Sequence, residues 1–218
     1  MAPMRQARRL SWLLGAAALL VSGCLLGNGS PPPRYFVPES TAASDPQEIG
    51  SPQSAATAPS VKLGQVGAVA YIGERIVWRR SEVERGIYEQ RRWLEPPAHY
   101  VERALVQQLF DAGKLRRVES GPVPTVDAEL LAFDEILTPI HEAYVEIAVS
   151  LHDPRDATLY ERTLSAHEPI ADADPASVAR AMGRALDTVV AEAAREIVAR
   201  VQLPASAPVR ERHEQGRK

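Results

Sequence analysis

The stretch Glu142–Leu151, EAYVEIAVSL, decides the fold class of this chain. Apolar residues occupy every second position, and mostly polar residues stand between them. This period of two is typical of a β-strand with one buried face and one face in solvent. The following residues, Asp153–Asp156, have turn chemistry, so we expect a hairpin with a second strand over 158–164. The sequence therefore predicts an antiparallel hairpin with one covered face.

Two segments have the period and the end signals of helices. The first is expected to begin at Pro97, because proline suits the first turn, and to end at Gly113. The second begins at Pro175 and is capped by Asp174. Its apolar stripe consists of Val178, Met182, Ala185, Leu186, Val189, Ala193, Ile197 and Val201.

Further strands complete the predicted sheet. We expect a buried strand over 61–72, an extended stretch at 76–78, and strands at 115–118 and 128–137, whereas 81–88 fits either a strand or a helix. The economical packing of these elements is an α+β, sandwich-like domain. In it, one mixed, mostly antiparallel sheet packs against two main helices.

The N-terminal residues have the three parts of a lipoprotein signal. Three arginines precede the apolar run Leu10–Val21, which is shorter than the roughly 20 residues that a membrane-spanning helix needs. Small residues then lead to Cys24, the only cysteine of the chain. The pattern resembles a bacterial lipobox, which implies cleavage after Gly23 and covalent diacylglycerol and N-acyl lipid on Cys24. The alternative is a chance cysteine behind an ordinary secretory signal.

Charge and the residue after the cysteine bear on partners and location. The formal net charge of −3 includes three arginines of the signal, so the mature chain is near −6, which argues against a nucleic-acid partner. Leu25 follows Cys24, where an aspartate would signal retention in the inner membrane. By resemblance, this favours a lipid anchor in the outer membrane with the protein facing the periplasm; inner-membrane anchoring is the alternative.

Composition divides the rest of the chain. Residues 24–60 are rich in Gly, Pro, Ser, Ala and Thr, and are expected to be a flexible tether with a short edge strand at 35–37. Residues 61–202 are expected to form one domain, and residues 203–218 a disordered tail. An exposed edge such as 35–37 can pair with a neighbouring copy, so a homo-oligomer is a further hypothesis.

Three blocks of sequence resemble a known family. They are Arg34–Pro38 (RYFVP), Tyr71–Val77 (YIGERIV), and Tyr88-Glu89 followed by Arg92–Pro97 (RWLEPP). They are similar to the ABC-type transport auxiliary lipoproteins, the group that includes the paraquat-inducible-operon lipoprotein. The positions that carry the resemblance, and that we take as candidate partner-binding residues, are Tyr35, Phe36, Tyr71, Arg75, Trp93 and Pro96. The polar insertion 39–60 departs from the family pattern.

The resemblance implies a non-catalytic component of an MCE-type lipid transport system. Its partners would be an MCE-domain protein, an ABC permease and an ATPase, and it would need no cofactor. Two alternatives stay open. One is a free-standing envelope lipoprotein that binds peptidoglycan or a secretion or assembly machine. The other is a small-lipid binding domain with a pocket between sheet and helix.

The sequence offers no catalytic or metal-ligating constellation. It lacks a Gly-x-Ser-x-Gly elbow and a phosphate loop, and neither His141-Glu142 nor His167-Glu168 continues as His-Glu-x-x-His. Asp134 and Glu135 are neighbours on an expected strand, so they face opposite sides and cannot share a proton. Trp93 has two interpretations, a partner contact or a core residue beside the helix start, and the second is favoured.

Overall fold

The structure is a computed structural model that describes residues 31–39, 58–111 and 114–202. Gly23 and Cys24, most of the polar insertion, Gly113 and the predicted tail 203–218 lie outside the described residues. The residues from Pro33 onward form one compact unit, and the description below concerns that unit alone.

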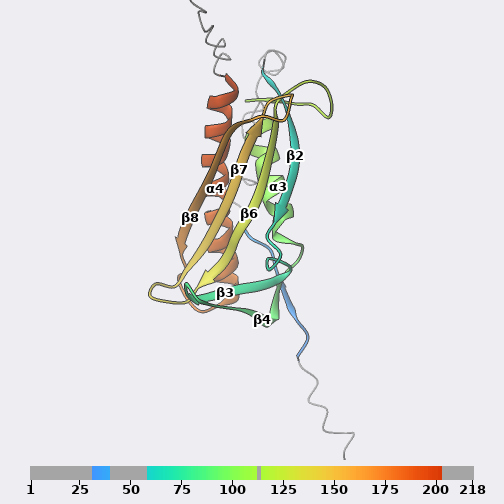
Figure 1. Ribbon diagram of the computed structural model, residues 1–218. Helices are drawn as coiled ribbons and strands as arrows, with labels where there is room; N and C mark the ends of the chain where they lie inside the picture. The colour runs from blue at the N-terminus through green and yellow to red at the C-terminus, as the bar shows by residue number, and fades with distance from the viewer. Residues whose placement is uncertain (1–30, 40–57, 112–113, 203–218) are drawn as a thin grey trace, which may run out of the picture. The chain divides into compact units, whose positions relative to one another are not determined.

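The described residues form one sheet of eight strands and two helices, shown in Figure 1. The strands are β1 (Arg34–Phe36), β2 (Ser60–Ala68), β3 (Arg75–Ser81), β4 (Glu84–Trp93), β5 (Arg116–Arg117), β6 (Thr125–Ile136), β7 (Glu142–His152) and β8 (Thr158–Pro169). The helices are α3 (Pro97–Val106), which continues as a π-helical turn η2 (Gln107–Asp111), and α4 (Pro175–Gln202). This confirms the predicted α+β class.

Strand β6 is the centre of the sheet. One of its edges pairs with β7 in an antiparallel ladder, and β8 continues that ladder outward. The other edge pairs in parallel with β2 and then with β3, because Ala68 lies opposite Leu130 and Val77 opposite Asp134. β3 turns back into β4, and β1 lies parallel to β4. The sheet is therefore mixed, with its longest ladders antiparallel.

Both helices cover the same face of the sheet. α4 packs on β7 and β8, and α3 packs on β2 and β6; Figure 1 shows them behind the upright strands, while β3 and β4 cross the lower end. The alternation that the sequence predicts for β7 is present, since every second side chain is buried under α4. The opposite face of the sheet carries no helix of the described chain, and we call it the open face.

Some expected elements differ from the structure. The strand predicted as buried over 61–72 is β2, which ends at Ala68 and is mostly half-exposed; Val61 is its only fully buried residue. Two of its nine residues, Gly64 and Gly67, contribute no side chain to the core, and no helix of the described chain covers the opposite face of the sheet. The segment 81–88, which the sequence left open between strand and helix, contains the turn between β3 and β4 and the first half of β4.

The segment after β1 lies against α4 at a glycine. The Glu39 N–H donates to the Ala179 carbonyl at 3.3 Å. A Cβ on Gly183 would overlap the backbone carbonyl of Glu39. Gly183 therefore allows the backbone that enters the domain to approach the helix closely.

Replacing Gly183 with alanine is expected to loosen residues 34–39. The overlap with Glu39 costs about 1–3 kcal/mol, and the better helix propensity of alanine offsets roughly 1 kcal/mol of it. Hydrogen exchange should therefore show faster exchange at residues 34–39, with a small loss in the free energy of unfolding. Gly73→Ala is the control, because a Cβ there meets no atom within 4 Å. Unchanged protection of residues 34–39 in Gly183→Ala would contradict the prediction.

Candidate functional site

The structure separates the six candidate residues into two groups. Phe36 and Trp93 are partners in the β1–β4 ladder and face the helices. Trp93 is 1% exposed and packs edge-on against Phe133, with 5.2 Å between ring centroids. It cannot contact a partner, so the interpretation as a core residue holds. Pro96 immediately precedes α3 at its N-cap position.

Tyr35, Tyr71 and Arg75 lie on the open face. Arg75 of β3 is the register partner of Arg92 in β4, and Arg92 is the register partner of Tyr35 in β1. Register partners point to the same side of a sheet. We call Arg75, Arg92 and Tyr35 the arginine–tyrosine row.

The row borders a shallow hollow of about 300 Å³, which we call the hairpin hollow. Its lining consists of Ala70, Tyr71, Gly73, Glu74, Arg75, Ile87 and Arg92. Arg75 is exposed and has no ion-pair partner among the described residues. Arg92 lies 3.9 Å from Glu74 through Nη1, and its buried Nε makes no hydrogen bond within the described part of the chain. The hollow thus offers two arginines that are incompletely neutralised.

Asp134 is a buried carboxylate next to the hairpin hollow. Arg85 approaches its Oδ2 at 3.3 Å and Arg79 at 3.9 Å. Arg79 also lies over the ring of Tyr144, 4.6 Å from its centroid. Burial raises the pKa of Asp134, and the two arginines lower it less than burial raises it. Because both arginines belong to the β3–β4 hairpin, this cluster attaches the hairpin to β6.

Glu135, the next residue of β6, is a second buried carboxylate. It lies opposite Ala143 in the register, whereas Asp134 lies opposite Tyr144, so the two carboxylates face opposite sides as expected. Glu135 Oε1 is 2.8 Å from His141 Nε2. Burial, and then the charge of Glu135, raise the pKa of Tyr88 to about 12. The two acids of β6 are therefore separate sites and do not act together on one proton.

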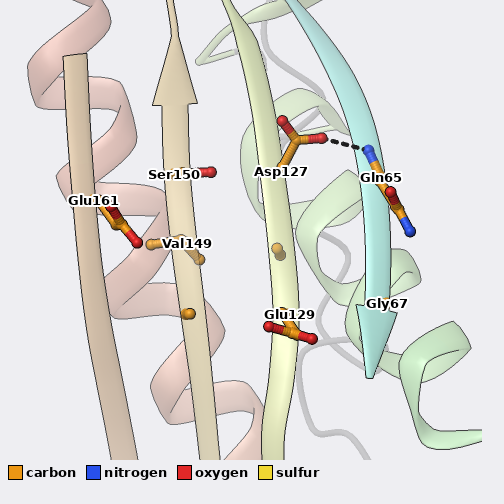
Figure 2. Close-up of a pocket in the computed structure, with 9 residues that line it drawn as sticks. Gln65, Gly67, Asp127, Glu129, Val149, Ser150 and Glu161 are labelled. Atoms are coloured by element: carbon orange, nitrogen blue, oxygen red, sulfur yellow. Dashed lines mark hydrogen bonds between the residues drawn. The ribbon is translucent and has the colours of Figure 1, made fainter. Parts of the chain in front are cut away.

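A second hollow of about 450 Å³ lies on the open face between β2, β6, β7 and β8. Figure 2 shows Asp127, Glu129, Ser150 and Glu161 on these strands, with the helices behind them. Asp127 Oδ1 accepts a hydrogen bond of 2.6 Å from the Gln65 backbone N–H. We call this the acidic hollow. The open face is therefore divided by charge, with arginines around the hairpin and carboxylates over the centre of the sheet.

The histidines of the described residues pair with separate acids and do not form a shared cluster. Within 31–39, 58–111 and 114–202, no three His, Cys, Asp or Glu side chains lie close enough together to hold a metal ion. His141 and His167 pair with different glutamates, Glu135 and Glu142. None of the helices in the described ranges is long and apolar enough to cross a membrane.

Sequence reasoning named Asp134 and Glu135 but missed their burial and their arginine partners, and it missed the arginine–tyrosine row. A signal was present: Asp134 and Glu135 interrupt an apolar strand, and residues 75–93 contain six arginines and three glutamates. The sequence does not show the strand register that brings these arginines to the two acids. Only the parallel pairing of β3 with β6 brings the arginines over Asp134.

The comparisons with known proteins agree with this fold. A crystal structure of a Xanthomonas campestris protein is similar with a TM-score of 0.64 and 20% identity, over 78% of this chain and 97% of the other. A second, described as an uncharacterized protein, has a TM-score of 0.57 and 13% identity, over 76% of this chain and 99% of the other. At these identities the likeness shows the fold alone. Among curated proteins, none matches the chain.

One family model matches residues 43–194, described as "ABC-type transport auxiliary lipoprotein component". The matched segment contains the sheet from β2 onward, α3 and most of α4, together with Tyr71, Arg75, Trp93 and Pro96. Cys24, Tyr35 and Phe36 precede it. The match covers more than half of the chain. The chain therefore belongs to the family of ABC-type transport auxiliary lipoprotein components.

Proposed function

We propose that this protein is a non-catalytic docking piece of an MCE-type lipid transport system. It would be anchored through acylated Cys24 in the outer membrane, face the periplasm, and work with an MCE-domain protein, an ABC permease and its ATPase. The family match over residues 43–194, downstream of the lipobox that ends at Cys24, is the observation that carries the proposal. ATP hydrolysis would belong to the partner ATPase.

The open face supports a docking role. Its two hollows are shallow, and their linings are charged. A helix-free sheet face with segregated charge favours an oriented encounter with a complementary protein surface. A small-lipid binding domain would instead need an enclosed apolar cavity.

The test is photo-crosslinking of the full-length, tagged protein in its own cells. A photoreactive residue replaces Thr163, which is exposed on β8 opposite Ala148 of the acidic hollow. The control replaces Thr188, which is exposed on α4. We expect an adduct with an MCE-domain protein from position 163 and at least several-fold less from position 188.

Other adducts have a defined meaning. Crosslinks to peptidoglycan or to a secretion machine, with no MCE-domain protein recovered, would replace the proposal with the free-standing envelope lipoprotein. Equal adducts from both positions would contradict the assignment of the open face as the docking surface.

A further inference from the structure

Exposed apolar side chains gather at one end of the domain. Eight large apolar residues of the described chain are exposed. Six of them lie in β1, in the β3–β4 hairpin or directly beside these strands: Tyr35, Val37, Tyr71, Val83, Ile87 and Leu94. Val83, at the hairpin turn, is 96% exposed. A seventh, Ile140, lies in the β6–β7 turn. This turn lies against β3, because the Leu137 N–H, at the start of the turn, donates to the Arg79 carbonyl.

Arginines lie among these apolar residues. The row Arg75–Arg92–Tyr35 crosses the open face beside Tyr71 and Ile87. Arg75 has no ion-pair partner in the described residues, and Arg92 meets only Glu74 at 3.9 Å. We call Tyr35, Tyr71, Arg75, Ile87 and Arg92 the hairpin surface.

We propose that the hairpin surface docks on the anionic phospholipid surface of the membrane that holds the lipid anchor. Tyrosine is enriched at the membrane–water interface, and arginine is attracted to anionic headgroups. The acyl chains proposed on Cys24 already supply stable attachment, so a basic contact beside them would set the orientation of the domain on the membrane. This inference rests on the proposed acylation of Cys24 and adds an orientation to it.

The length of the chain between Cys24 and β1 supports docking on the membrane that holds the anchor. Between Cys24 and Arg34 the backbone can span at most about 35 Å, at 3.3–3.6 Å per residue. Arg34 begins β1, and the next residue, Tyr35, belongs to the hairpin surface. The anchor therefore restricts this surface to the neighbourhood of the bilayer.

Charge supports it as well. The mature chain is near −6, so an anionic bilayer repels the chain as a whole. The hairpin surface is a local exception, because Arg75 is exposed without an ion-pair partner among the described residues and Arg92 lies 3.9 Å from its one ion-pair partner, Glu74. Docking there would leave the acidic hollow available to a partner protein.

The experiment uses the acylated full chain, reconstituted at one copy per lipid nanodisc. Gly73→Cys supplies a reporter on the rim of the hairpin hollow, where a Cβ meets no atom within 4 Å. An environment-sensitive label reacts there alone, because acylation blocks Cys24. The matched control is Leu159→Cys, which is exposed on β8 beside the C-terminal end of β7. That end of β7 lies roughly 35 Å along the strand from the end at the β6–β7 turn. Discs contain phosphatidylethanolamine with or without phosphatidylglycerol, and spin-labelled headgroups quench the label.

We expect quenching at position 73, and not at position 159, in discs with phosphatidylglycerol. About 0.5 M salt should reduce it by screening. Arg75→Gln should lower the ratio of docked to free protein about fivefold, since one arginine near such a surface contributes about that factor. Arg155→Gln, an exposed arginine of the β7–β8 turn, should leave the ratio unchanged.

Equal quenching at both positions would overturn the inference. Quenching at position 73 that is the same with and without phosphatidylglycerol would also overturn it. Quenching that appears only with two copies per disc would mean that the surface binds another copy, and would also overturn it. The mass of the purified protein separates the two proposals. A chain without acyl groups refutes the anchor and this inference with it, whereas an acylated chain that fails to dock refutes only the inference.

Discussion

Replacing Trp93 with alanine is expected to lower the free energy of unfolding by about 3–5 kcal/mol, the range for removing a large buried aromatic side chain. The ring is 1% exposed and lies edge-on to Phe133 beneath the β1–β4 ladder. Its loss leaves a cavity where β1, β4 and the helices meet. Urea unfolding followed by far-UV circular dichroism measures the effect without depending on the tryptophan signal.

Tyr35→Ala is the comparison, because Tyr35 is a candidate residue of the same ladder but faces the opposite side. Its side chain is 54% exposed, so the substitution should change stability by no more than about 0.5 kcal/mol. A Trp93→Ala protein as stable as Tyr35→Ala would show that the tryptophan does not support the core. The candidate positions therefore lie on both faces of the sheet, with Trp93 packed in the core and Tyr35 exposed.

The sequence predicted the elements whose burial is regular. β7 and α4 each have one buried side over their whole length, so a period of two or of 3.6 residues identifies them from the sequence alone. Asp174 caps α4 as expected, because its Oδ1 accepts a hydrogen bond of 3.3 Å from the Ala176 backbone N–H. These features depend on residues that are close together in the chain.

The features that sequence reasoning missed depend on distant residues. β2 and β3 pair one after the other with the same edge of β6, and the sequence of neither segment predicts that pairing. The pairing places the hairpin arginines over Asp134 and brings Arg75 beside Tyr71. The role of Gly183 likewise depends on Glu39, which precedes it by more than a hundred residues. The family resemblance thus named Tyr35, Tyr71 and Arg75 as candidates, and only the sheet topology gives their arrangement.

Asp134→Ala is expected to destabilise the domain by about 3 kcal/mol at neutral pH. The substitution leaves Arg79 buried without its carboxylate, and breaking one side of a buried ion pair costs about 3–5 kcal/mol. The lower end applies because Arg85 is 40% exposed and can turn to water. Glu129→Ala is the control on the same strand; Glu129 is exposed, and its loss should change stability by no more than about 0.5 kcal/mol.

The same carboxyl group should make stability depend on pH. Burial raises the folded pKa of Asp134 above the ordinary value of 3.8, so the folded state holds the proton more strongly than the unfolded state does. This contribution is fully present below the unfolded pKa and is lost as pH rises through the folded pKa. The free energy of unfolding of the wild type, minus that of Asp134→Asn, should therefore fall over this window. A difference that rises with pH would mean that the arginines outweigh burial.

Removing both partners separates the value of the charge pair from the cost of leaving one charge alone. In Asp134→Leu with Arg79→Met, no buried charge lacks a partner, and apolar replacement of a buried pair is often neutral or stabilising. We expect this double variant to recover most of the stability that Asp134→Leu alone loses, with a coupling energy of roughly 1–3 kcal/mol in the double-mutant cycle. Additive losses would show that Asp134 and Arg79 do not depend on each other. Recovery with a detached hairpin, detected as faster hydrogen exchange in β3 and β4, would show that the pair determines where the hairpin lies more than how stable the domain is.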